Sequence, residues 1–116
     1  MNDETMRITG RKVRDGCRLT LSGELTIYTA AALKERLVRE LEEPGSMEID
    51  LEKVTDLDTA GFQVLYGLRR ACARIGKDLK ISSPSRTVRE VFELYNAARH
   101  FGNSFLNPER DKIERT

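Results

Sequence analysis

Two kinds of apolar periodicity alternate along this chain, and this alternation limits the folds open to it more than any other feature. Apolar residues recur at every second position in 18–22 and again in 47–51, the pattern of half-buried strands. Helical spacings of three and four follow each of these segments, first from Ala30 to Leu41 and then from Phe62 to Ile75. Strands that alternate with helices in this way indicate an α/β fold with parallel strand pairs.

The remaining elements are shorter. A first strand is expected from 6–8 and 12–14, with a turn at Gly16, and residues 79–81 predict a further strand. Ser83-Pro84 is a typical helix start, and the third helix it begins is expected to end at Gly102. Its predicted buried residues are Val88, Val91, Phe92, Tyr95 and Ala98. We therefore expect a small mixed sheet of about four to five strands with three to four helices packed on it.

The length of 116 residues suits a single domain, and we assign all of 1–116 to it, with a core of 6–102 and a polar tail of 103–116. Charged residues make up 34% of the chain, but its net charge is only +1, without the basic surplus of a nucleic-acid binder. Two cysteines and one histidine do not supply the ligands of a zinc site. No apolar run fits a signal peptide or a membrane span, so we expect a cytoplasmic protein that does not insert into membranes.

Helix boundaries give the first indication of a site. Thr29 is the expected N-cap of the first helix, and Pro44-Gly45 ends that helix. Asp58 is the expected N-cap of the second helix, where its carboxylate would accept a hydrogen bond from the N–H of Ala60 or Gly61. Gly76 is the expected stop of the second helix.

Thr59 follows this cap and falls in the first turn of the second helix. Spacings of four, three and four place it on one stripe with Gln63, Tyr66 and Arg70, opposite much of the apolar face. We expect its hydroxyl to face solvent at a helix N-terminus, where backbone N–H groups tolerate a phosphate. The residues alone leave two interpretations open, a simple helix cap and a phosphoacceptor at a partner-docking edge.

A combination of motifs resembles the STAS family of sulfate transporter and anti-sigma factor antagonist domains. The motifs are Leu21-Ser22-Gly23-Glu24-Leu25, Thr29-Ala30, Asp50-Leu51 and, above all, Leu57-Asp58-Thr59-Ala60-Gly61 before an apolar helix. They occur in the family's order and spacing over roughly residues 6–102. Sporulation-type members usually carry Asp where this chain has Thr26, and Thr26-Ile27-Tyr28 resembles instead STAS proteins of proteobacterial chemotaxis gene clusters.

The resemblance implies a regulatory binding module and not an enzyme. In anti-sigma factor antagonists the Ser or Thr after the Asp is phosphorylated by the anti-sigma kinase, and this position corresponds to Thr59. The implied partner is an anti-sigma factor with serine kinase activity or a related signalling protein, with a phosphatase as a further candidate. ATP and Mg²⁺ would belong to the kinase, so no cofactor is expected here. The implied partner-binding residues are Glu24, Thr26, Tyr28, Asp58, Thr59, Ala60, Gly61, Gln63, Tyr66 and Arg70.

Alternatives of other kinds stay open at this point. Cytoplasmic STAS subunits of lipid-transport ABC complexes also carry Asp-Thr-Ala-Gly, and there the Thr edge docks an ATPase subunit. A response-regulator receiver domain would use Asp56 or Asp58 as its phosphoacceptor, but this chain has no acidic pair after its first strands. Paired carboxylates such as Glu24 and Asp58 could serve a hydrolase, but no neighbouring residues suggest a pocket for a substrate.

Overall fold

Four strands and three helices make up the part of the chain that the structure, a computed structural model, describes: residues 5–95. They are β1 (Met6–Val13), β2 (Gly16–Leu25), α1 (Ala30–Leu41), β3 (Ser46–Leu57), α2 (Thr59–Ile75), β4 (Leu79–Ser82) and α3 (Arg86–Leu94). The strands form one sheet in the order β1-β2-β3-β4, in which β1 and β2 are antiparallel and the other two pairs are parallel. The expected small mixed sheet with helices is confirmed.

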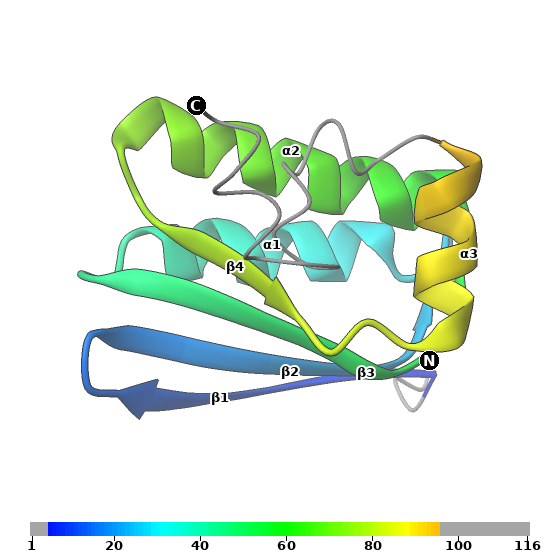
Figure 1. Ribbon diagram of the computed structural model, residues 1–116, viewed down its shortest axis with the longest axis horizontal. Helices are drawn as coiled ribbons and strands as arrows, with labels where there is room; N and C mark the ends of the chain where they lie inside the picture. Colours follow the sequence, from blue (N-terminus) through cyan, green and yellow to red (C-terminus); the bar gives the residue numbers. More distant parts are fainter. Residues whose placement is uncertain (1–4, 96–116) are drawn as a thin grey trace.

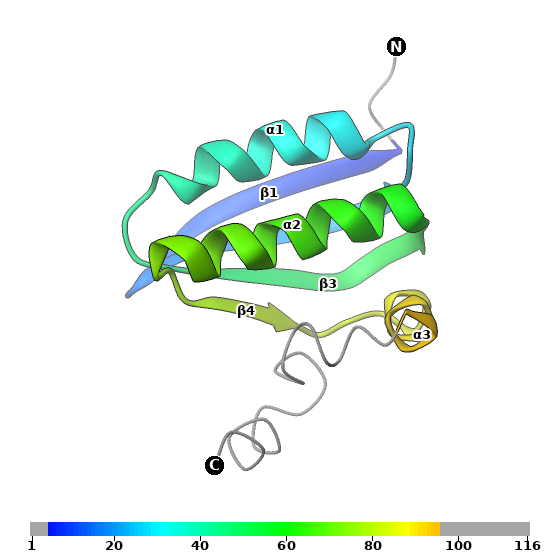
Figure 2. The ribbon, with the colours of Figure 1, turned by 90° about the horizontal axis from the view of Figure 1, so that it is seen from above.

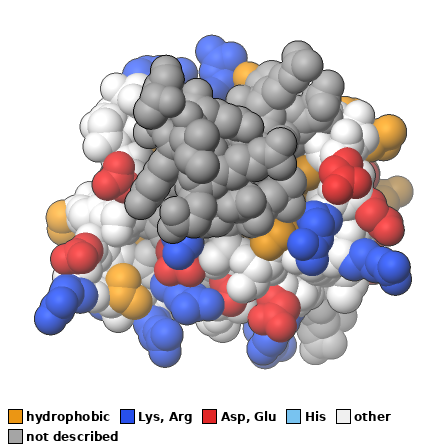
Figure 3. Space-filling view, viewed as in Figure 1, with side chains coloured by type: hydrophobic (Ala, Val, Ile, Leu, Met, Phe, Trp, Pro, Cys, Tyr) orange, Lys and Arg blue, Asp and Glu red, His pale blue; other side chains and the backbone are white. Residues whose placement is uncertain are grey.

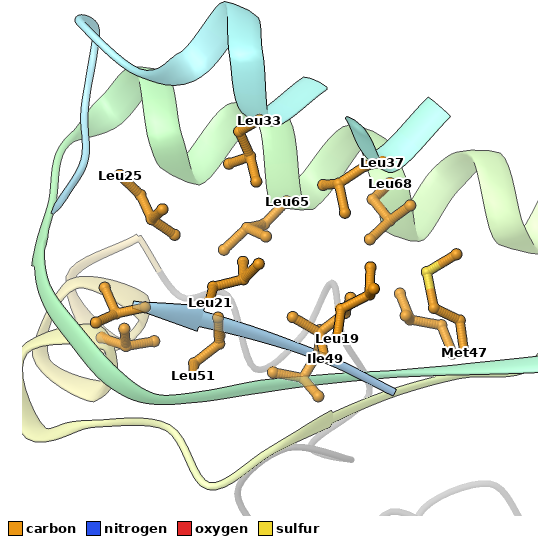
Figure 4. Close-up of a cluster of buried hydrophobic side chains, with 14 of the residues drawn as sticks. Leu19, Leu21, Leu25, Leu33, Leu37, Met47, Ile49, Leu51, Leu65 and Leu68 are labelled. Atoms are coloured by element: carbon orange, nitrogen blue, oxygen red, sulfur yellow. The ribbon is translucent and has the colours of Figure 1, made fainter. Parts of the chain in front are cut away.

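The helices α1 and α2 lie side by side on one face of the sheet, and α3 lies at the end of the sheet where α2 begins (Figures 1 and 2). Leucines from both long helices point toward the sheet and meet apolar side chains of β2 and β3 (Figure 4). The labelled members of this cluster are Leu19, Leu21, Leu25, Leu33, Leu37, Met47, Ile49, Leu51, Leu65 and Leu68. Burying each of these large side chains stabilises the fold by about 1.5–3 kcal/mol, so this layer holds the helices on the sheet.

The charged residues of the chain are spread over its surface. On the described part of the face seen in Figure 3, Lys and Arg side chains are interspersed with Asp and Glu. Two ion pairs among residues 5–95 are partly buried: 2.8 Å separates Arg18 Nη2 from Asp50 Oδ2 on neighbouring strands, and 3.0 Å separates Arg36 Nε from Glu40 Oε2 within α1. On this face opposite charges lie close together, whereas α2 contains three arginines and no acidic residue, so the small net charge of the sequence does not mean that the charges are evenly distributed.

Two irregularities lengthen β3 beyond its predicted end at residue 51. The pairing of β2 with β3 shifts register between Thr20 and Ser22 and again between Gly23 and Glu24. Each shift adds one residue to β3, so its buried residues Leu51, Val54 and Leu57 follow at intervals of three instead of two. The strand thereby continues to Leu57, so that Asp58 follows it directly and lies at the start of α2.

Several predicted boundaries hold and others move. Gly76 ends α2 in the left-handed conformation, with φ of 73°, as expected. Ile75, however, is 59% exposed, because it lies in the last turn of α2 and not over the sheet. The first strand is continuous, and Gly16 begins β2 instead of forming the turn, which falls on the two preceding residues.

The third helix begins later than its sequence predicts. Ser85, not Ser83, is the N-cap, and its hydroxyl accepts a hydrogen bond from the Val88 N–H at 3.2 Å. The Ser85 N–H donates to the carbonyl of Leu51, so a contact with β3 sets where the helix starts. Val88 and Phe92 are buried as predicted, whereas Val91 is half-buried. The expected roles of Ala98, Gly102 and the 103–116 tail lie outside the described residues.

Candidate functional site

Asp58 connects three segments at the start of α2. Its Oδ1 accepts a hydrogen bond from the Gly61 N–H at 3.0 Å, as predicted, and its Oδ2 accepts one from the Ile27 N–H at 2.9 Å. Its own N–H donates to the carbonyl of Leu25 at 3.2 Å. Partial burial alone would raise the pKa of this carboxyl, but the backbone N–H groups of Gly61 and Ile27 hold the pKa below its usual value. Asp58 is therefore charged at neutral pH and fixes the β2–α1 loop against the helix start.

The β2–α1 loop is stabilised from within by two threonines. The Thr29 hydroxyl donates to the Glu24 carbonyl at 2.8 Å and accepts from the Thr26 N–H at 2.9 Å. Thr29 is thus at the expected N-cap position of α1, but its hydroxyl closes the loop instead of capping the helix. Thr26 is only 7% exposed, and its hydroxyl accepts from the Tyr28 N–H at 3.3 Å. This arrangement leaves Ile27 68% and Tyr28 93% exposed at the tip of the loop.

Thr59 lies exposed in the first turn of α2, as predicted, but its hydroxyl does not face solvent alone. It forms a hydrogen bond with the hydroxyl of Tyr95, the residue that follows α3. The Tyr95 ring stacks on Phe62, with 4.8 Å between the ring centroids, and Phe62 in turn meets Phe92 edge to face at 5.5 Å. The sequence prediction of Tyr95 as a core residue is therefore wrong in part: its ring packs on the core, but 37% of the residue is exposed beside Thr59.

Gly61 is required where α2 passes close to β2. A Cβ atom at this position would lie 2.1 Å from the Leu25 carbonyl oxygen and 2.9 Å from Leu57 Cδ1. Any larger residue would push the start of α2 away from the sheet, and with it Asp58 and Thr59. Gly61 is buried, so it positions the site and offers no side chain to a partner.

The other predicted site residues extend along α2. Tyr66 is half-buried and stacks on Phe62 with ring centroids 6.2 Å apart, and the Arg70 guanidinium lies 6.0 Å from the Tyr66 ring centroid. Gln63 is exposed, and both it and Ala60 line a groove between α1 and α2. Glu24 is exposed near the end of β2, before the β2–α1 loop begins.

Together these contacts form one continuous edge made from the β2–α1 loop, the start of α2 and the end of α3. We call Ile27, Tyr28, Asp58, Thr59 and Tyr95 the Thr59 edge. Leu94, 77% exposed, lies next to it in the chain. Ile27, Leu94 and Tyr95 are not among the predicted partner-binding residues. They are 32 or more residues from Thr59 in sequence, and only the packing of the loop and of α3 brings them to this edge. Within residues 5–95 no group of His, Cys, Asp or Glu is placed to hold a metal ion, and no helix is long and apolar enough to span a membrane.

Comparison with known proteins shows the family to which this sequence belongs. A curated relative, the anti-sigma-B factor antagonist of Bacillus subtilis (strain 168), is 27% identical over 77 residues, which span 66% of this chain and 71% of the relative. The family model described as "Mlab, STAS domain" matches residues 8–106, most of the chain.

Solved structures show the same fold at low sequence identity. The anti-sigma factor antagonist SpoIIAA in its unphosphorylated form has a TM-score of 0.69 at 18% identity, covering 94% of this chain and 95% of that one. An anti-sigma factor antagonist from Mycobacterium paratuberculosis has a TM-score of 0.76 at 16% identity, with coverage of 94% and 92%. The phosphorylated form of Bacillus SpoIIAA gives 0.66 at 18% identity, with coverage of 95% and 97%. The chain belongs to the STAS domain family and has the fold of its anti-sigma factor antagonists.

Proposed function

We propose that this chain is a regulatory, non-enzymatic protein-binding module of the anti-sigma factor antagonist type, switched by phosphorylation of Thr59. The partner would be a serine/threonine kinase of partner-switching or chemotaxis-linked signalling, and a phosphatase would reverse the modification. The observation that carries the proposal is the position of the Thr59 hydroxyl: it lies on an exposed edge, at a helix N-terminus whose neighbouring loop is fixed by Asp58.

The chemistry of the edge suits a switch that acts at an interface. A phosphate adds about −1.5 to −2 charges and three strong acceptors, which would change the net charge of the chain from +1 to about −1. The N-terminus of α2 can accept this charge without unfolding, because backbone N–H groups and the helix dipole favour an anion there. A partner packed on the exposed side chains of Ile27 and Tyr28 would have to desolvate the same charge, beside the carboxylate of Asp58.

Tyr95 gives the switch a second consequence inside the chain. Its hydroxyl forms a hydrogen bond with the hydroxyl that would be esterified, so phosphorylation must replace that contact. A phosphate at Thr59 would either accept a hydrogen bond from Tyr95 or displace its ring from Phe62. Both outcomes alter the surface that a partner meets at the end of α3.

The relatives favour this function over the lipid-transport alternative. The curated relative and the solved structures named above are anti-sigma factor antagonists. None of these named relatives is described as a subunit that docks an ABC ATPase.

Affinity capture from the native cell tests the proposal. The baits are the wild-type chain, Thr59→Ala and Thr59→Glu, with Thr9→Glu on the exposed strand β1 as a control for added charge. We expect wild type, Thr59→Ala and Thr9→Glu to recover the same kinase-like partner, and Thr59→Glu to lose most of it. Mass spectrometry of the wild-type bait should also detect phosphate on Thr59. Equal recovery by the Ala and Glu variants at Thr59 would refute the switch.

A further inference from the structure

A second surface of the molecule starts at the predicted partner-binding residues Ala60 and Gln63 and continues along α1 and α2, beyond the part that the proposed switch uses. Side chains of α1 and α2 line an open groove between the two helices, with a volume of about 490 Å³. Most of its lining is apolar, and the residues that matter here are Leu37, Val38 and Leu41 from α1 and Val64, Gly67 and Ala71 from α2. Figure 2 shows the two helices running side by side along the sheet, so the groove follows the direction of both helices.

Gly67 leaves space in this groove that no residue described in the structure fills. It lies in the middle of α2, its φ is not positive, and a Cβ atom placed on it would meet nothing within 4 Å. Neither the backbone conformation nor the packing of residues 5–95 requires glycine here, although glycine destabilises a helix relative to alanine. Gly61, on the same helix, is required by its contact with β2. The free space at Gly67, beside the 48% exposed Val38, is therefore available to a group from another molecule.

The charged residues beside the groove indicate which kind of molecule would bind in it. The sequence of α2 contains three arginines and no acidic residue. Spacings of three, four and seven place Gly67, Arg70 and Arg74 on one exposed stripe of the helix, and Lys34 is the charged residue that lines the groove from α1. A second copy of this chain would bring its own α2 arginines against these and be repelled. An acidic molecule would be attracted.

From this shape and charge we infer that the α1–α2 groove docks an amphipathic helix of a partner protein, with acidic residues flanking its apolar face. Helices pack at interaxial distances of about 8–10 Å, and small side chains at the contact allow the shorter end of this range. The apolar side of the partner helix would lie over Val64, Gly67 and Ala71, while its acidic residues would meet Lys34, Arg70 and Arg74. This is the helix-in-groove mode of recognition, and it does not require that Thr59 be phosphorylated.

A selection experiment with peptides of defined chemistry tests the inference. The probe is a displayed library of amphipathic helical peptides of about 18 residues, or five turns, in which the apolar face is constant and the polar positions vary among acidic, basic and neutral residues. The full chain is the target. Two variants are matched by the residue introduced: Gly67→Leu fills the groove, and Ala73→Leu adds the same side chain to an exposed position of α2 that does not line it. Circular dichroism confirms that both variants are folded.

We expect the selection to enrich acidic peptides. The best of them should lose affinity for Gly67→Leu by about tenfold or more and bind Ala73→Leu as it binds the wild type. Reversing the charges with Arg70→Glu and Arg74→Glu should weaken the same peptide further as salt is lowered, because attraction has become repulsion. No enrichment above an unrelated protein, enrichment of basic or neutral peptides, or equal binding to both leucine variants would overturn the inference. So would a wild-type dimer that Gly67→Leu dissociates, since a second copy would then occupy the groove.

Discussion

Two glycines on α2 should respond in opposite directions to the same substitution. Gly61→Ala places a methyl group 2.1 Å from a backbone oxygen of Leu25 and 2.8 Å from its carbonyl carbon. Neither atom belongs to a flexible side chain, and the same carbonyl accepts a hydrogen bond from Asp58 N–H, so the clash can be relieved only by moving α2 from the sheet. Gly67→Ala places its methyl group where nothing lies within 4 Å.

The size of both effects follows from these contacts. Overpacking costs about 1–3 kcal/mol, and contact with rigid backbone puts Gly61→Ala at the upper end of that range. Alanine recovers about 1 kcal/mol of helix propensity, so the net loss at Gly61 should be about 2 kcal/mol or more. Gly67→Ala should gain up to about 1 kcal/mol because only the propensity changes. The two variants should therefore differ by about 3 kcal/mol in free energy of unfolding, although the two glycines lie only six positions apart on one helix.

Urea unfolding followed by circular dichroism measures both values. The free energy of unfolding should fall with urea concentration at the same slope in the wild type and both variants. Differences in the urea midpoint then report differences in stability directly. A Gly61→Ala variant as stable as the wild type would show that α2 is not held as close to β2 as described. A Gly67→Ala variant less stable than the wild type would show that the space above Gly67 is occupied within the chain, and would also remove the basis for the groove as a docking site.

Two further predictions concern the Thr59 edge. Asp58→Asn should lower the free energy of unfolding by about 1 kcal/mol at neutral pH, because asparagine has one side-chain oxygen and cannot accept from both Gly61 N–H and Ile27 N–H. The folded-state pKa of Asp58 is below its ordinary value of 3.8, so its stabilisation is present above that value and lost as the pH falls through the lower, folded-state pKa. Unfolding curves of the two proteins should accordingly converge in acid, and a constant difference would contradict the prediction. Tyr95→Phe keeps the ring on Phe62 and removes only the hydrogen bond to Thr59, so it should cost less stability than Tyr95→Ala in thermal unfolding. Equal losses would show that the hydroxyl matters more than the ring.

The extent to which the sequence predicted this molecule depends on how local each signal is. Helix α2 was predicted with its cap at Asp58 and its stop at Gly76, because both ends are determined by hydrogen bonds and backbone conformations within a few residues. The start of α3 was predicted two residues early, since Ser85 is held by a hydrogen bond to the distant strand β3. No local pattern marks that contact.

The same distinction applies to the candidate site. The motif from Asp58 to Gly61 and its exposed Thr59 could be predicted, since an N-cap and a helical stripe are properties of consecutive residues. Thr26 was predicted as a contact residue, but its hydroxyl lies inside the loop, where it supports the exposed Tyr28. Tyr95 was predicted from helical spacing as a core residue, and spacing cannot show that the end of α3 lies beside the start of α2.

By itself the sequence determined the alternation of strands and helices, their apolar faces and the cap that begins α2, because these depend on periodicity and on interactions between near neighbours. The tertiary structure decided the rest. Bulges let β3 extend to the residue before Asp58, and the absence of a Cβ at Gly61 lets α2 pack closely against β2. The packing of α3 places the Tyr95 hydroxyl within hydrogen-bond distance of Thr59. These features depend on contacts between residues far apart in the chain, and such contacts exist only once the layers have packed together.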